Sequence, residues 1–495
     1  MEDEVALTAQ KVFGVQYLYP WQRLVIANIL DASQWATNPV LGRDDVPTKQ
    51  IVLLPTGAGK SLCFMVPAVL LTGPTLIFYP LLALMSDQER RIEESGIGYV
   101  TFRGGQSKEE REENFRKIQS GAKIILANPE VLQNKSLVER LSRCGIAHIA
   151  IDEAHCVSEW GDSFRPAYLT LGQIIKDIGC PVVTAFTATA SETVLNRVSE
   201  VLFDGNAHVV RGASDRPNIR YHVKYAYCKD KAVAELAVTW EKPMIIFCSS
   251  RKRTERMASF LRCYMESENI RFYHAGLSRE EKSLCEKWFY DKKDAILVST
   301  CAFGMGVDKK DIKTVVHLDA PTTAEAYIQE AGRGGRDGSV ANAILVWSPA
   351  DNKDFEAFPP NSRERVLYDF ANTTGCRRQV LLDALGGEEV VCAGCDICDN
   401  TADFIPRDKE RVMNFAKRYP LQFSLDDFTI KLEGTFAKEY NDSLPSPWEQ
   451  RDLSLLVCTL LAEKSLLRSE KILTKNLLTI TEKSKNPFRF RKKQH

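Results

Sequence analysis

A glycine-rich segment in the first part of the chain has the residue types that bind phosphate. It reads Leu54-Pro-Thr-Gly-Ala-Gly-Lys60-Ser61 and directly follows an apolar run. Glycines allow backbone N–H groups to face a phosphate, and the N-terminus of a following helix adds positive partial charge. The lysine can reach the β- and γ-phosphates, and the serine hydroxyl can ligate Mg²⁺. Since leucine stands where the general pattern has its first glycine, a chance glycine turn is the alternative interpretation. The predicted phosphate contacts are Thr56, Gly57, Gly59, Lys60 and Ser61.

Two adjacent carboxylates end a later apolar run, Ile149-Ala-Ile-Asp152-Glu153-Ala154-His155. Asp152 suits a magnesium-holding role, and Glu153 suits a general base that activates the water attacking a phosphoryl group. Paired acids at the end of a strand are common in proteins of many kinds. Their place after a phosphate loop in chain order makes the hydrolytic interpretation specific.

A third segment with chemical potential is Gln329-Glu-Ala-Gly332-Arg333-Gly-Gly-Arg336-Asp337. Arginines in a glycine-rich turn make poor core residues, but they suit charge stabilisation on a transferring phosphoryl group. A solvated basic turn is the alternative interpretation. Gln329, Arg333 and Arg336 are therefore the catalytic candidates. Because the segment belongs to a second predicted sheet, Arg336 would reach the phosphates across a cleft that closes on nucleotide binding and reopens after hydrolysis.

The cysteines of one loop-rich segment have the spacing of a metal site. Cys376 is followed by Cys392-Ala-Gly-Cys395-Asp-Ile-Cys398. Such C-x-x-C-x-x-C spacing with one distant partner suits a tetrahedral zinc site. An iron–sulfur cluster also uses four thiolates, so this alternative stays open.

The elements that must position these residues are short apolar runs that alternate with helical patterns. This alternation predicts parallel α/β sheets, and a break near 212–218 divides the runs between two sheets. The expected strands are Gln50–Leu54, Thr75–Tyr79, Lys123–Ala127, His148–Ile151, Val182–Phe186, Pro243–Cys248, Ala295–Ser299, Thr314–Leu318 and Ala343–Trp347.

The bulk composition is that of a soluble globular protein of 495 residues, with 44% hydrophobic and 26% charged residues. Lys+Arg and Asp+Glu are both 65, so any nucleic-acid surface must be local, as in the basic segment Asn486–His495. No charged residue lies between Lys60 and Asp87, a length that could span a membrane. Because Pro67 and Pro80 interrupt this stretch, we predict a helix, a turn and a strand instead. The acidic N-terminus and 14 cysteines indicate a protein that is not secreted and lies in a reducing compartment.

These motifs, taken in order, resemble superfamily 2 helicases and specifically the RecQ family of DNA helicases. The resemblance covers about residues 13–400. Besides the three segments above, it rests on Phe13-Gly14 with Pro20 and Gln22, Tyr79-Pro-Leu-Leu-Ala-Leu-Met-Ser-Asp87-Gln88, Asn128-Pro129-Glu130, Ala185-Phe-Thr187-Ala-Thr189-Ala, Asp215-Arg216-Pro217-Asn218, Tyr273-His274-Ala275-Gly276, Thr300-Cys-Ala-Phe-Gly304-Met-Gly306-Val-Asp308 and Cys376-Arg377-Arg378.

The resemblance implies ATP hydrolysis with Mg²⁺, movement along single-stranded DNA in the 3′-to-5′ direction, and unwinding of duplex DNA in repair or recombination. It implies that Gln22 reads the adenine edge, that Asp308 belongs to the nucleotide site, and that the cysteines bind Zn²⁺. The sequence departs from the family where Tyr19 replaces the usual arginine and Val15 replaces a frequent aromatic. The expected location is the cytoplasm or nucleoid of a bacterium, or the nucleus of a eukaryote.

An aromatic segment follows the paired acids and contains Trp160, Phe164 and Arg165. An exposed Trp and Phe with an Arg can stack on bases and contact phosphates of a single strand; core packing of Phe164 is the alternative. The segment is similar to the RecQ loop that couples DNA binding to ATP hydrolysis. It departs from that loop at Asp162 and Ser163, where the family usually has histidine and aspartate.

The predicted organisation is two RecA-like parallel-sheet domains, 1–213 and 214–350, a zinc-binding domain, 351–404, and a winged-helix-like domain, 405–495. The last is expected to contain helices at Asp408–Lys417, Leu425–Lys431 and Trp448–Glu463, and a β-pair at Leu466–Ser469 and Asn476–Thr481. The expected partner is DNA, single-stranded or at duplex junctions, without a membrane, and no protein partner is predicted. The alternatives are an RNA helicase and a DNA-annealing or clamping protein with weak motor activity.

Overall fold

The computed structural model describes residues 3–37, 46–55, 58–160, 166–188, 190–212, 215–301, 309–360, 362–387, 389–404, 408–438, 440, 446–469 and 476–480. Its contacts divide the chain into two units. The first unit runs to Arg216 and also includes Leu382–Glu389, and the second begins at Pro217.

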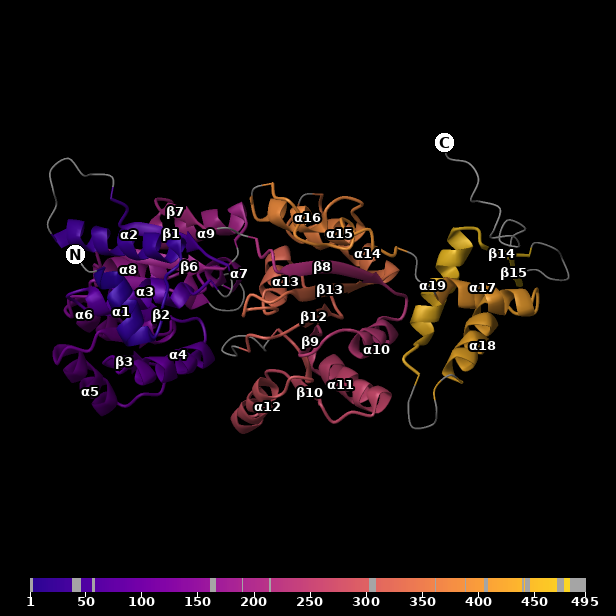
Figure 1. Ribbon diagram of the computed structural model, residues 1–495, viewed down its shortest axis with the longest axis horizontal. Helices are drawn as coiled ribbons and strands as arrows, with labels where there is room; N and C mark the ends of the chain where they lie inside the picture. Colours follow the sequence, from indigo (N-terminus) through magenta and orange to yellow (C-terminus); the bar gives the residue numbers. More distant parts are fainter. Residues whose placement is uncertain are drawn as a thin grey trace. The chain divides into compact units, whose positions relative to one another are not determined.

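The first unit, drawn in indigo to magenta in Figure 1, is built on a seven-stranded parallel sheet. Its strand order is β3-β4-β2-β5-β6-β1-β7. Its strands are β1 (Lys49–Leu53), β2 (Thr75–Phe78), β3 (Tyr99–Phe102), β4 (Ile124–Ala127), β5 (His148–Ile151), β6 (Val183–Thr187) and β7 (His208–Arg211). The helices are α1 (Glu4–Phe13), α2 (Pro20–Thr37), α3 (Lys60–Leu70), α4 (Leu82–Ser95), α5 (Lys108–Gln119), η1 (Val131–Gln133), α6 (Lys135–Ser142), α7 (Cys156–Trp160), η2 (Pro166–Tyr168), α8 (Leu171–Ile178) and α9 (Glu192–Phe203).

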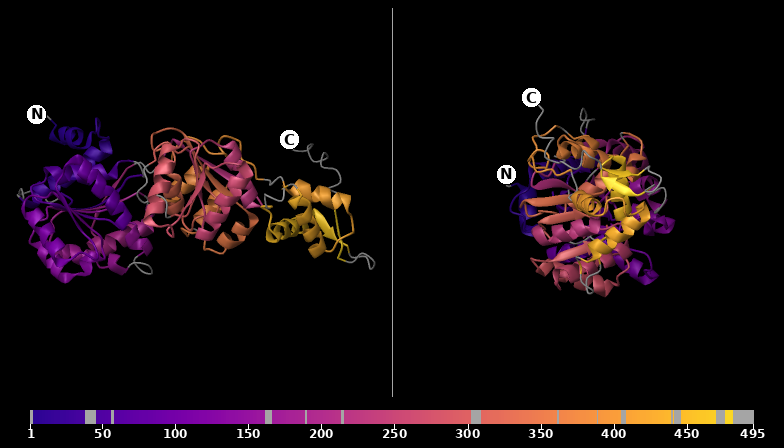
Figure 2. Two further views of the ribbon diagram at one scale, coloured as in Figure 1. Left: turned by 90° about the horizontal axis from the view of Figure 1, so that it is seen from below. Right: turned by 90° about the vertical axis from the view of Figure 1, so that its right-hand side faces the viewer.

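Helices cover both faces of this sheet, as Figure 2 shows. Side chains alternate between the two faces: in β1, Ile51 and Leu53 belong to the core that includes residues of α5, α6, α8 and α9, whereas Val52 belongs to the core that includes residues of α2, α3 and α4. A parallel strand buried on both faces is apolar along its whole length. This explains why the central strands are easy to find in the sequence.

The second unit contains a six-stranded parallel sheet with the order β10-β11-β9-β12-β13-β8. Its strands are β8 (Ile219–Tyr225), β9 (Met244–Phe247), β10 (Ile270–Tyr273), β11 (Ile296–Ser299), β12 (Thr314–His317) and β13 (Ala341–Trp347). Its helices are α10 (Lys229–Thr239), α11 (Arg251–Met265), α12 (Arg279–Asp291), α13 (Ala324–Ala331), α14 (Pro349–Glu356), α15 (Val366–Asn372) and α16 (Arg377–Ala384), the last of which ends in the first unit. Helices α10 and α11 share a core with one face of the sheet.

In the C-terminal part of the second unit, the described residues form three helices and an antiparallel pair of strands. They are α17 (Asp408–Arg418), α18 (Leu425–Ala437), α19 (Gln450–Ala462), β14 (Leu466–Arg468) and β15 (Leu478–Ile480). Their common core includes Phe428, Leu432 and Leu456, and Tyr227 and Cys228 from the segment after β8 join it. These are the elements predicted for a winged-helix-like domain.

The predicted fold class of two RecA-like parallel sheets is confirmed. Every predicted strand is present within about two residues of its expected bounds. The prediction missed β3, β7, β8 and β10, which are the outermost strands on the two sides of each sheet. In β8, for example, buried residues alternate with exposed or half-buried ones over Ile219–Val223. Its sequence therefore lacks a continuous apolar run.

The uncharged stretch after Lys60 folds as α3 and β2, as predicted. Among the helices that the structure describes, none combines the length and apolar character needed to cross a membrane.

Candidate functional site

The predicted phosphate loop follows β1 and the paired acids follow β5, at the carboxyl edge of the first sheet, where β6 lies between these two strands. Backbone hydrogen bonds continue the ladder just past these strands: Leu54 N–H donates to the Thr187 carbonyl at 3.1 Å, and Ala154 N–H donates to that of Phe186 at 2.8 Å. Lys60 is the first residue of α3, and its Nζ lies 3.5 Å from the Leu54 carbonyl oxygen. Thr56 and Gly57 lie outside the described residues.

The two acids share a constrained turn. Glu153 has a φ of +49°, in the left-handed region that non-glycine residues seldom adopt. Its N–H donates to Asp152 Oδ1 at 3.0 Å, which helps to hold this conformation. Burial and the Glu153 carboxylate raise the pKa of Asp152 to about 7, although the Lys60 ammonium acts in the opposite direction. Bound Mg²⁺ would favour the ionised form of Asp152 in the same way as the Lys60 ammonium.

Two residues near the acids were not predicted to have a role in the site. His155 Nδ1 lies 3.1 Å from Thr187 Oγ1 and 3.4 Å from Glu153 Oε2. Thr187 ends β6, so this chain of contacts connects the end of the neighbouring strand to the predicted base. Both residues occur in the sequence motifs, but only the sheet order places them together.

Gln22 connects the start of α2 to the phosphate loop. Its Oε1 accepts from Tyr19 N–H at 2.9 Å, and its Nε2 donates to the Ala58 carbonyl at 2.9 Å. Gly59 adopts a φ of +75°, and a Cβ atom there would lie 2.3 Å from Gln22 Nε2. Gly59 is thus required both by its backbone conformation and by the close approach of Gln22.

The arginine segment lies in the second unit, between α13 and β13. Gln329 is in α13, Arg333 is buried, and Arg336 is half-buried. The Asn218 side-chain amide donates to the Gly335 carbonyl at 2.9 Å and to the Ser339 carbonyl at 2.8 Å. The sequence contained Asn218 in a recognised motif, but gave no sign that it holds the arginine turn.

The four thiols of Cys376, Cys392, Cys395 and Cys398 all lie within 4.8 Å of one another. Ligands 2.3 Å from a tetrahedral Zn²⁺ stand about 3.8 Å apart, so this donor set fits a single zinc ion. Burial raises the pKa of Cys376. At Cys395, burial is outweighed by hydrogen bonds from the backbone N–H groups of Cys398 and Arg377, which lower the pKa of that thiol.

The cysteine loop also joins the outer edge of the second sheet. Asp396 N–H donates to the Tyr221 carbonyl at 3.0 Å, and the Asp396 carboxylate accepts from Val223 N–H at 2.9 Å. The same carboxylate pairs with the buried Arg377 guanidinium at 2.5 Å. The loop therefore covers backbone groups of β8 that an edge strand would otherwise expose.

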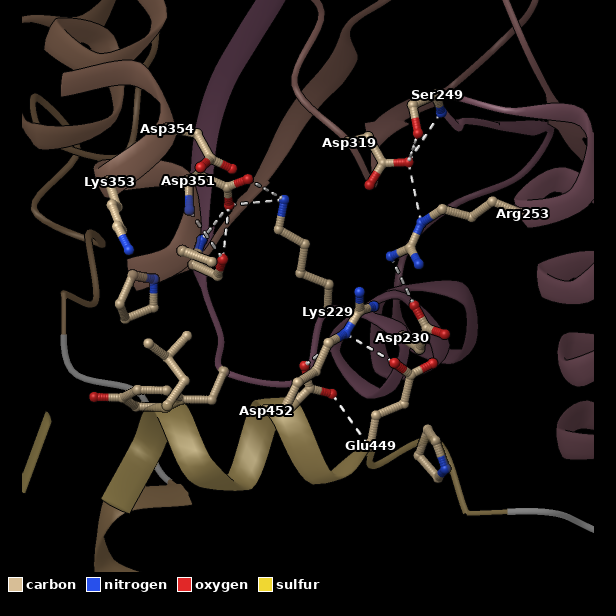
Figure 3. Close-up of a pocket in the computed structure, with 17 residues that line it drawn as sticks. Lys229, Asp230, Ser249, Arg253, Asp319, Asp351, Lys353, Asp354, Glu449 and Asp452 are labelled. Atoms are coloured by element: carbon tan, nitrogen blue, oxygen red, sulfur yellow. Dashed lines mark hydrogen bonds and ion pairs between the residues drawn. The ribbon is translucent and has the colours of Figure 1, made fainter. Parts of the chain in front are cut away.

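A separate cavity of about 530 Å³ lies at the carboxyl ends of β9, β12 and β13, between the second sheet and α19 (Figure 3). Its lining is rich in charged side chains that pair with one another. Arg253 contacts Asp230 and Asp319, both at 3.0 Å, and Lys229 contacts Asp351 at 2.7 Å. This pairing indicates a structural junction.

Several predicted site residues lie outside the described part of the chain. These are Asp308, Phe164 and Arg165, together with the side chain of Trp160, whose backbone ends α7.

Comparisons with known proteins define first the class and then the family. The DEAD/DEAH box helicase family matches residues 19–198, and the helicase conserved C-terminal domain matches residues 228–338. These matches, together with the phosphate-loop site, define a helicase of this class.

The ATP-dependent DNA helicase RecQ of Pasteurella multocida (strain Pm70) is 34% identical over 448 residues, covering 87% of this chain and 68% of that protein. The probable ATP-dependent DNA helicase RecS of Bacillus subtilis (strain 168) is 39% identical over 307 residues, covering 61% of each. The chain belongs to the RecQ family of ATP-dependent DNA helicases. It spans about two thirds of the length of these relatives.

The crystal structure of the DUF1998 helicase MrfA bound to DNA is similar in fold. It aligns with a TM-score of 0.57 at 17% identity, covering 98% of this chain and 63% of that chain.

Proposed function

We propose that this chain hydrolyses ATP to move along single-stranded DNA in the 3′-to-5′ direction and to separate duplex DNA in repair or recombination. The observation that carries the proposal is the placement of Lys60, Asp152 and Glu153 past the carboxyl ends of β1 and β5, the two strands that flank β6. Membership of the RecQ family supports DNA as the nucleic acid along which the protein translocates.

Each residue of the site has a role that its chemistry suits. Lys60 would contact the β- and γ-phosphates, and Ser61 and Asp152 offer the oxygen ligands that Mg²⁺ prefers. Bound Mg²⁺ would neutralise charge on the transferring phosphoryl group. Glu153 would accept a proton from the attacking water. Arg336, supplied by the second unit, would stabilise the charge that develops on the phosphoryl oxygens.

The test combines phosphate release with strand separation. Purified protein should release phosphate from ATP faster when single-stranded DNA is added, and should unwind a DNA duplex with a 3′ overhang but not one with a 5′ overhang. Matched RNA duplexes form the second arm. Preferential unwinding of RNA would identify RNA, and not DNA, as the substrate. Strand annealing without phosphate release would identify a DNA-annealing or clamping protein, and not a motor.

Trp160, Phe164 and Arg165 are proposed to couple strand binding to hydrolysis, because they directly follow the catalytic acids. Trp160→Ala and Arg165→Ala should keep basal ATPase and the melting temperature but reduce stimulation by single-stranded DNA. With Asp162 and Ser163 in the loop, we expect stimulation in the wild-type to survive in altered form. If Trp160 were a core residue, its truncation would lower the melting temperature and leave stimulation by DNA unchanged, since truncating a buried aromatic costs about 3–5 kcal/mol.

The four thiols are proposed to hold one Zn²⁺ per chain with a structural role. Cys395→Ser should lower zinc content and soluble yield together, because the metal organises a segment with little other core and this segment covers the edge of β8. Iron and a visible absorption band in protein purified without oxygen would assign an iron–sulfur cluster instead.

A further inference from the structure

A buried tyrosine lies beside the first of the paired acids at the carboxyl edge of the first sheet. β2 and β5 are neighbours in this sheet, with Phe78 opposite Ile151, and Asp152 N–H donates to the Phe78 carbonyl at 3.0 Å. The ladder thus continues one residue past both strands, which places Tyr79 next to Asp152. Ala150 and Tyr79 belong to the same core. Because side chains alternate along a strand, Asp152 lies on the face of the sheet that Tyr79 occupies.

The Tyr79 hydroxyl is a hydrogen-bond donor in an apolar setting. The side chain is fully buried, in a core that includes Ala58 of the phosphate loop and Phe64 of α3. Within the part of the chain that the structure describes, the hydroxyl has no hydrogen-bond partner. Burying a hydroxyl without a partner is unfavourable, and phenylalanine would fill the same space without that disadvantage. A role beyond packing would explain why the ring carries a hydroxyl.

The charges around this hydroxyl indicate where it can donate. Burial raises the pKa of Tyr79 well above its usual value; among the charged neighbours, Asp152 has the largest effect and also raises it, Arg91 lowers it, and Asp87 raises it. Asp87 already pairs with Arg91 at 3.2 Å. Asp152 accepts from Glu153 N–H through Oδ1, and its second carboxylate oxygen can accept a further donor. Of the two acids, Asp152 is therefore the better acceptor for the phenol.

We propose that Tyr79 is a positioning residue whose hydroxyl donates a hydrogen bond to the Asp152 carboxylate, directly or through one water molecule, and fixes its orientation for binding Mg²⁺. The inference rests on the proposed function, in which Asp152 and the Ser61 hydroxyl hold the Mg²⁺ of the bound nucleotide. Both side chains offer the oxygen atoms that this ion prefers. Carboxylates that bind metal ions are themselves held by hydrogen bonds from surrounding groups, and these groups tune the affinity for the ion.

Tyr79→Phe tests the proposal, because it removes the hydroxyl and keeps the ring. Binding of ADP to the full chain is measured by calorimetry without DNA, once with Mg²⁺ and once with a chelator. Wild-type should bind ADP more tightly with Mg²⁺, and Tyr79→Phe should reduce this gain by roughly 10-fold, the lower end of the usual effect on metal affinity of losing such a hydrogen bond. Without Mg²⁺, wild-type and variant should bind ADP equally well.

The matched control is Tyr327→Phe, which should keep the full gain from Mg²⁺. Tyr327 is also fully buried, its hydroxyl has no partner among the described residues, and it belongs to the second unit. A melting curve without nucleotide gives the second readout. Tyr79→Phe should melt at the wild-type temperature or above it, because the hydroxyl that it removes makes no hydrogen bond within the described chain.

Three results would overturn the role of Tyr79 and leave the proposed function standing. They are an unchanged gain from Mg²⁺ in Tyr79→Phe, an equal loss of ADP affinity with and without Mg²⁺, and a lower melting temperature with an unchanged gain, which would show a purely structural hydroxyl. Conversely, a gain from Mg²⁺ that depends on Tyr79, in a protein without DNA-stimulated hydrolysis, would refute the proposed function and support the role of Tyr79.

Discussion

The carboxyl ends of the two parallel sheets carry charged residues that are used in opposite ways. In the first sheet, Lys60, Asp152 and Glu153 form the predicted ATP site, and the two acids are adjacent in the chain. In the second sheet, Asp319 lies just past Leu318 at the end of β12 and is paired with Arg253. Ligands of open α/β sheets bind outside the carboxyl ends of the strands. Among the residues that the structure describes at these two edges, those predicted to act in phosphoryl transfer lie in the first sheet.

The difference shows that location alone does not make a site. In the cavity of the second sheet, acids face basic partners, and Glu449, which caps the N-terminus of α19, pairs with Arg256 of α11 at 2.6 Å. These charges hold the C-terminal helices to the sheet. In the first sheet, burial and the neighbouring Glu153 disfavour the ionised form of Asp152, which suits a residue that is to meet a cation.

The largest expected effect follows from changing the first site. Lys60→Ala and Glu153→Gln should each lower DNA-stimulated ATP turnover by roughly 10²- to 10⁵-fold, because each removes a group that acts in the transition state. Arg336→Ala should do the same. Phosphate release measures the loss, and Glu153→Gln should still bind ATP. Lys135→Ala is the matched control, since Lys135 is also the first residue of a helix in this unit and is exposed.

Melting curves separate chemistry from folding in these variants. The melting temperatures of the Lys60 and Glu153 variants should stay close to that of the wild-type. Near-normal turnover in any variant would show that the changed residue is not catalytic. A large fall in melting temperature would show that the charged residues of the first sheet stabilise the fold, as those of the second sheet do.

The sequence predicted the central strands but not the edges, for a physical reason. A strand such as Thr75–Phe78 is buried at every position and forms an apolar run. The edge strand His208–Arg211 has one buried residue and charged or polar ends, so its sequence resembles a loop. Its identity as a strand depends on pairing with β1, which only the tertiary structure provides.

The candidate site shows the same division. The residue types and order of the phosphate loop and the acids predicted their chemistry directly. The contact between Gln22 and Ala58 joins residues 36 positions apart and had no local signal.

A smaller effect is expected from Arg253→Ala in the second sheet. The variant leaves Asp230 and Asp319 without their shared partner in a partly buried cavity, so the free energy of unfolding should fall by about 1–3 kcal/mol. Affinity for Mg-ADP should not change. Urea denaturation and calorimetry measure the two quantities, and Lys252→Ala is the control because Lys252 is exposed on the same helix. Weakened ADP binding with unchanged stability would mean that the second cavity belongs to the nucleotide site.

The smallest effect concerns pH and Asp452, an acid of α19 at the same cavity. Burial raises the pKa of this carboxyl to about 6; among its charged neighbours, Arg451 lowers it, and Glu449 and Asp230 raise it. The folded protein therefore binds a proton more readily than the unfolded chain, for which the pKa is near 3.8. The stability that protonation contributes is fully present below that lower value and is lost as the pH rises through about 6.

Asp452→Asn should remove this dependence, because an amide does not ionise and can still accept the hydrogen bond that Glu449 N–H donates to Asp452 at 3.3 Å. Relative to the wild-type, the variant should gain stability between pH 5 and pH 7.5, by an amount of the order of 1 kcal/mol. Urea denaturation at the two pH values measures the gain. Asp354→Asn is the control, since this acid lines the same cavity but is exposed. If the Asp452→Asn variant gained no stability with rising pH, or gained no more than Asp354→Asn, burial would not be what disfavours the ionised carboxylate. The cavity would then be open to water, and the ion pairs across it would contribute little to holding α19 on the second sheet.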